Sequence, residues 1–93
     1  MSIRLELIFP TPLDRDGEIR MLLAAATLPE IRRTALSPDR RRSAWYGGEM
    51  PSERVVAALA EAGLVAEVRS GLAPEAEAEL ATPAGERFRP IGR

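Results

Sequence analysis

Three acidic side chains stand close together near the start of the chain and could bind a metal ion. They are Asp14, Asp16 and Glu18. Carboxylate oxygens suit Mg²⁺ and Ca²⁺, but a dedicated calcium loop supplies about six or more oxygens at defined spacing, which this segment lacks. Aspartate before a helix also accepts hydrogen bonds from exposed backbone N–H groups. We therefore interpret the segment as a helix cap, and a metal site at these three residues is the alternative.

Other catalytic chemistry is limited by what the 93 residues lack. There is no cysteine and no histidine, which excludes disulfides, thiolate nucleophiles, serine-histidine triads and the usual zinc and copper ligands. We predict that the protein is not an enzyme and uses no cofactor. Lysine, asparagine and glutamine are also absent, so all thirteen cationic side chains are arginine. This composition indicates a GC-rich bacterial genome or a heat-adapted source.

Charge and hydropathy predict a cytoplasmic protein with no nucleic-acid or membrane partner. The net charge is −1 and charges of both signs are interspersed, whereas binding to nucleic acid or a membrane surface needs a basic patch. We interpret the run from Arg40 to Arg42 as a solvated hairpin tip, with an anion site as the alternative. No segment has the roughly 18 apolar residues that span a bilayer, and no signal-like segment is recognisable.

The sequence predicts a strand before the acidic residues and a helix that begins at them. Residues 3–9 place apolar side chains at every second position, which predicts a strand that Pro10 and Pro12 end. A helix is predicted over 18–27, with Asp14 or Asp16 as its N-cap.

Residues 51–69 predict a second helix that leads directly into a strand. Ser52 is a suitable N-cap, and Gly63 suits the left-handed position that follows a helix. After Gly63 the apolar period changes from helical spacing to two. The residues predicted to share the buried face of this strand are Leu64, Ala66 and Val68.

Two further strands, 31–36 and 42–47, flank a Ser-Pro-Asp-Arg turn and form a hairpin. The element order is therefore βαββαβ. It predicts an α+β, ferredoxin-like sandwich in which a four-stranded antiparallel sheet carries two helices on one face. We assign residues 1–71 to this domain and residues 72–93 to a C-terminal extension or tail.

The first predicted helix carries more apolar surface than one sheet face can cover. Met21, Ala25 and Leu28 form one apolar stripe, and a second stripe beside it consists of Ile19, Leu22, Leu23 and Ala26. We expect the tail, a homodimer partner or another protein to cover the surplus. Trp45 and Tyr46 are adjacent in a strand, so one is predicted in the core and the other against the tail or a partner. These five residues form the predicted interaction surface.

Three stretches of the sequence occur in an order shared with a known family. They are Leu28-Pro29-Glu30-Ile31, Ser37-Pro38-Asp39-Arg40-Arg41 and the stretch from Val55 to Val68. They resemble the turn into the second strand, the hairpin, and the last helix and strand of heavy-metal-associated domains. These are small ferredoxin-like modules of copper chaperones and heavy-metal P-type ATPases. The likeness covers about residues 3–70.

The resemblance implies a metal site whose ligands this chain lacks. The family holds Cu(I) or another soft ion with a Gly-Met-x-Cys-x-x-Cys loop between its first strand and first helix. Asp14 and Gly17 stand at the two cysteine positions, and Pro12 stands at the methionine position. We predict a non-enzymatic domain that acts through protein contacts or self-association. The alternative is a metal-binding or metal-transport accessory protein that uses the loop from Asp14 to Glu18.

Overall fold

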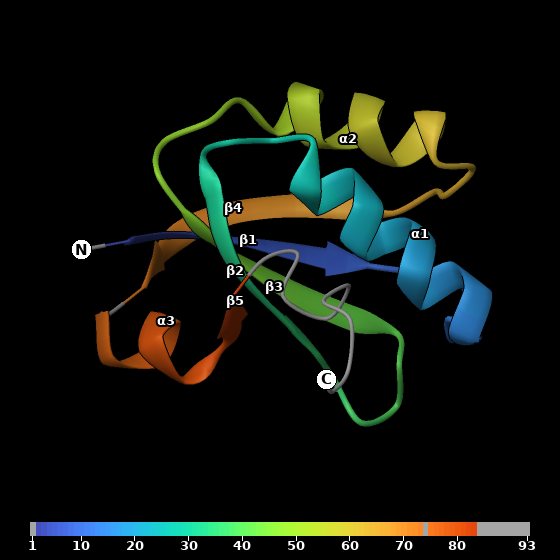
Figure 1. Ribbon diagram of the computed structural model, residues 1–93, viewed down its shortest axis with the longest axis horizontal. Coiled ribbons are helices and arrows are strands. Elements are labelled where there is room, and N and C mark those ends of the chain that lie inside the picture. The colour runs from blue at the N-terminus through green and yellow to red at the C-terminus, as the bar shows by residue number, and fades with distance from the viewer. Residues whose placement is uncertain (1, 74, 84–93) are drawn as a thin grey trace, which may run out of the picture.

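The computed structural model describes residues 2–73 and 75–83 as one antiparallel sheet with α1 and α2 on one side and α3 on the other (Figure 1). The elements in chain order are β1 (Ser2–Ile8), α1 (Arg15–Ala26), β2 (Ile31–Leu36), β3 (Arg42–Gly47), α2 (Ser52–Glu61), β4 (Glu67–Ala73), α3 (Glu75–Leu80) and β5 (Thr82–Pro83). The first six elements confirm the predicted ferredoxin-like α+β fold, and the strand order is β4-β1-β3-β2-β5. No helix in the described part of the chain is long and apolar enough to cross a bilayer.

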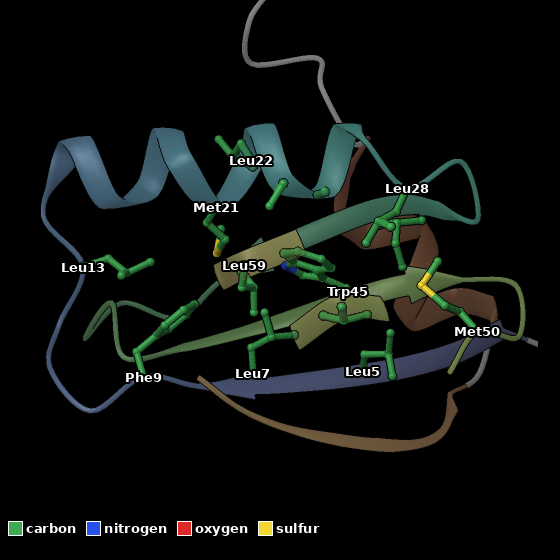
Figure 2. Close-up of a cluster of buried hydrophobic side chains, with 14 residues drawn as sticks. Leu5, Leu7, Phe9, Leu13, Met21, Leu22, Leu28, Trp45, Met50 and Leu59 are labelled. Carbon is green, nitrogen blue, oxygen red and sulfur yellow. The ribbon is translucent and has the colours of Figure 1, made fainter. Parts of the chain in front are cut away.

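The core lies between the sheet and the two longer helices. Side chains alternate along β1, so Leu5 and Leu7 point toward α1 and α2 and are fully buried. Leu5 is opposite Trp45 in β3, and directly opposed residues of two strands share one face. Figure 2 shows Trp45 near the middle of the apolar cluster. We call this side of the sheet the helix face and the other side the open face.

The one polar atom of the Trp45 side chain has a hydrogen-bond partner inside the core. Its Nε1–H donates to Ser43 Oγ at 3.1 Å, and the Ser43 hydroxyl donates to the carbonyl oxygen of Ala35 at 2.7 Å. A buried N–H group without an acceptor costs about 1–3 kcal/mol. This relay therefore allows the indole to be fully buried.

α1 begins at Arg15, earlier than the start predicted at residue 18. Asp14 is its N-cap, one of the two residues predicted for that role, and its Oδ1 accepts a hydrogen bond from Gly17 N–H at 2.7 Å. A negative charge also suits the positive end of the helix dipole. Asp14, for which the sequence left a helix cap and a metal ligand as alternatives, therefore caps the first turn of α1.

α2 ends before Gly63, as predicted, but begins without the predicted cap. Ser52 is the first helical residue and no side chain caps the helix, so the prediction of Ser52 as N-cap is wrong. Gly63 has a φ of 81°, the left-handed conformation predicted for this position. Leu64 N–H still donates to the Leu59 carbonyl at 2.8 Å. Because the chain is held to the helix end, regular pairing with β1 starts only at Glu67.

The C-terminal part of the described chain adds to the sheet. β4 runs to Ala73, past the domain boundary predicted at residue 71, because β1 begins at Ser2 and pairs with β4 to its end. β5 then pairs with β2 at Arg33 and Thr34. Residue 74 and residues 84–93 of the predicted extension lie outside the described residues.

Candidate functional site

The five residues of the predicted interaction surface are buried within the chain itself. They are Met21, Ala25, Leu28, Trp45 and Tyr46. Figure 2 shows three of them, Met21, Leu28 and Trp45, within the core cluster. The stripe of α1 that contains Met21 and Ala25 packs on the helix face, so these side chains are not available at the surface. Any contact surface would therefore consist of other residues.

The second apolar stripe of α1 remains partly exposed. Leu23 is 51% exposed and Ile19 is 41% exposed. Leu23 forms part of the wall of an open groove between α1 and α2, with a volume of about 580 Å³, whose other apolar walls are mostly alanine. The groove also carries Arg20 and Arg54, but each is already paired: Arg20 Nε lies 2.8 Å from Asp16, and Arg54 Nη1 lies 2.8 Å from Glu30.

Tyr46 lies on the open face beneath the C-terminal extension. This agrees with the prediction that one of the two adjacent aromatic residues is in the core and the other lies against the tail or a partner. It packs with Ala81, and its hydroxyl donates to Glu77 Oε1 at 2.8 Å. Arg4 Nη1 lies 2.9 Å from the same oxygen. The hydrogen bonds from Tyr46 and Arg4 lower the pKa of Glu77, and burial raises the pKa of Tyr46. This cluster fastens α3 to the sheet.

The acidic segment forms intramolecular contacts at each carboxylate. Asp14 caps α1, Asp16 pairs with Arg20, and Glu18 pairs with Arg40 Nη2 at 2.7 Å. Within residues 2–73 and 75–83, no three acidic side chains gather closely enough to hold a metal ion. Asp14 and Gly17, which the sequence resemblance aligns with the two cysteine positions, are joined by the capping hydrogen bond. The geometry therefore gives the metal-binding alternative no support.

The predicted hairpin tip is tied to the start of α1. Arg40 has a φ of 62°, and its Nε–H donates to the Leu13 carbonyl oxygen at 2.7 Å. Its Nη2 contacts Glu18, and Arg41 Nη2 donates to the Pro10 carbonyl at 3.3 Å. Two members of the arginine run thus bind oxygens of this chain, which explains the cationic run without a bound anion.

The two edges of the sheet differ. On the β2 side, β5 covers two residues, and Arg33 Nη1 donates to the Ala81 carbonyl oxygen at 2.8 Å. On the other side, β4 is the last strand in the order of the described sheet, and all seven of its residues pair with β1 in one continuous register (Figure 1). Leu72 in β4 is 70% exposed, and Val65, two residues before the start of this strand, is 76% exposed. β4, with seven residues, is therefore the longer of the two edge strands of the described sheet.

Comparison with known proteins gives no relative from which a function could be transferred. No family model matches the chain, and no curated protein matches it.

Proposed function

We propose that the protein is a non-enzymatic domain that makes protein contacts by accepting a strand at β4. The observation that carries this proposal is the difference between the two sheet edges. The chain covers part of the β2 edge with its own β5 but leaves β4 without a neighbour on its outer side among the described residues. An open edge presents unpaired N–H and C=O groups, which a further strand can satisfy.

β4 lacks most of the features that usually protect a sheet edge. Protected edges are short, or contain proline, charged side chains, a bulge or an inward-pointing charge. β4 has seven residues, contains no proline, pairs with β1 without a bulge, and carries two charged side chains. Its charged residues Glu67 and Arg69 lie on the open face, because they oppose Ile8 and Glu6. The helix face of the edge therefore carries no charge that would repel an added strand.

Strand addition also agrees with the composition of the edge. In this binding mode, backbone hydrogen bonds supply affinity and alternate side chains supply specificity. Val68 and Leu72 are the apolar side chains that β4 presents on the helix face, opposite Leu7 and Ile3. Leu72 is largely exposed, so an added strand would cover it.

A selection of displayed peptides tests this proposal without knowledge of the partner. The wild-type chain would be immobilised sparsely, so that neighbouring copies cannot meet, and random ten-residue peptides would be selected for binding to it. The binding site of the enriched peptides would then be mapped by the shifts of the protein's backbone amide signals. We expect enriched peptides with alternating apolar residues that shift the amides of β4. Leu72→Lys should abolish their binding, because it places a charge on the helix face of the edge.

Leu23→Lys is the matched control, since it changes an exposed leucine on α1 that lines the groove. It should leave peptide binding unchanged. Enriched peptides that shift groove amides and require Leu23, or a selection without enrichment, would contradict strand addition at β4.

A further inference from the structure

We infer that the strand accepted by β4 is β4 of a second copy of this chain, paired antiparallel about Ser70. This inference rests on the proposed function and adds the identity and register of the partner. It follows from the order of side chains along β4, which is complementary to itself when the strand is reversed.

The helix face of β4 has a symmetric pattern. Val68, Ser70 and Leu72 oppose Leu7, Leu5 and Ile3 of β1, so all three lie on the helix face. An apolar residue therefore stands two positions before Ser70 and another two positions after it. A twofold axis at Ser70 places Val68 of each copy opposite Leu72 of the other, and apolar cross-strand pairs of this kind stabilise a sheet.

This register also pairs the full length of the strand. With Ser70 opposite its own copy, residues 67–73 of one strand face residues 73–67 of the other, so no part of β4 is left over. The two exposed leucines, at position 72 in each copy, are both covered. The sheets of the two copies then form one continuous sheet.

Neighbouring registers are less favourable. An axis at Arg69 sets two arginines directly opposite each other, and like charges at opposed positions destabilise a sheet. An axis at Val68 opposes Glu67 with Arg69, but it pairs only three residues within β4 and leaves Leu72 beyond the regular strand. The axis at Ser70 is the one that combines full overlap with apolar pairing.

Gly71 is accounted for by this register. A Cβ at Gly71 would have no heavy atom within 4 Å, and its φ is not in the left-handed region, so the fold of one chain does not require a glycine there. Glycine inside a strand often marks a place where another chain segment approaches closely. In the inferred pair Gly71 faces Arg69 of the other copy, which leaves room for that guanidinium. Each Arg69 also keeps its own Glu67, whose carboxylate lies 3.0 Å away.

Single cysteines provide a direct test of the register, because the chain contains no other cysteine. Ser70→Cys places two thiols opposite each other at the axis, at a Cα separation of about 4.5–5.5 Å that a disulfide spans. We expect this variant to form a covalent dimer under mild oxidation by glutathione disulfide. Arg69→Cys and Val68→Cys are the matched controls. In this register the two copies of residue 69 are diagonal neighbours and the two copies of residue 68 are farther apart, so their Cα atoms lie beyond the roughly 7 Å that a disulfide can bridge.

Sedimentation velocity over a range of concentrations supplies the second measurement. Wild type should show a reversible monomer–dimer equilibrium. Leu72→Lys should weaken it by about tenfold or more, since the twofold axis repeats the substitution at two positions. Leu23→Lys should dimerise as wild type does. Preferential cross-linking of Arg69→Cys or Val68→Cys would overturn the register.

A wild-type chain that stays monomeric at millimolar concentration would overturn the self-pairing itself. The two proposals remain distinguishable in that case: a monomer that still binds selected peptides at β4 keeps strand addition and rejects the second copy as partner. A dimer that survives Leu72→Lys and yields no β4-binding peptides rejects both.

Discussion

Gly47 in β3 offers a sharp test of how closely the start of β2 approaches β3. Replacement of Gly47 by alanine would put a Cβ 1.9 Å from the carbonyl oxygen of Glu30 and 3.0 Å from Ile31 Cα. These are backbone atoms, so no rotamer change can relieve the overlap. The two segments must separate, which strains the hydrogen bond from Gly48 N–H to the Glu30 carbonyl, now 3.0 Å long.

The expected cost of Gly47→Ala combines two effects. Overpacking at a tight site typically costs about 1–3 kcal/mol, and a weakened backbone hydrogen bond adds about 1 kcal/mol. We therefore expect the free energy of unfolding to fall by about 2–4 kcal/mol. For a domain of this size that loss corresponds to a Tm lowered by roughly 8–30 °C.

Urea denaturation followed by the fluorescence of Trp45, the single tryptophan of the chain, measures this change. Gly48→Ala is the matched control. A Cβ at Gly48 meets nothing within 4 Å and its φ is not left-handed, so we expect neutrality or a gain of about 0.5 kcal/mol. Equal stabilities for the two alanine variants would refute the close approach of β2 and β3 at this point.

Three further outcomes test other parts of the structure. The pKa of Glu77 lies below its ordinary value of 4.5, so its contacts stabilise the fold above that pH and are lost as the pH falls through the lowered pKa. NMR signals of the Tyr46 ring should therefore report release of α3 in that acidic range, and Glu77→Gln should remove the transition. Titration with Mg²⁺ or Ca²⁺ should give no saturable amide shifts in residues 11–18; such shifts confined to this loop would revive the metal alternative. Asp14→Ala should lower the free energy of unfolding by about 1 kcal/mol, because it removes the helix cap. Asp16→Ala breaks only an exposed ion pair and should lower it by less than about 0.5 kcal/mol. Equal losses for the two variants in urea denaturation would argue against the cap.

The hairpin shows which features local sequence determines. β2 and β3 have the bounds predicted for them, residues 31–36 and 42–47. Proline at the second turn position and alternation on both sides specify such a hairpin locally. The reversal is closed by local hydrogen bonds, including Arg40 N–H to the Ser37 carbonyl at 2.9 Å.

The contacts of the C-terminal extension could not be predicted in the same way. β5 has only two residues, too few to show a period, and its partner strand lies far away in the sequence. The sequence predicted that one of Trp45 and Tyr46 would lie against the tail or a partner, but which of the two, and that it would meet Ala81, depends on the folded topology. The apolar stripes of α1 are a similar case, because the helical pattern does not reveal that Met21 is buried while Leu23 lines a groove at the surface.

The short strand β5 has a consequence for the size of any assembly built from this chain. A sheet that is open on both sides can grow by repeated addition into a fibre. Here Thr82–Pro83 occupies part of the far side, and a proline has no N–H group to offer to an incoming strand. An antiparallel pair of β4 strands uses the β4 edge of both copies, so further growth of the sheet would need the β2 side, which β5 already covers in part.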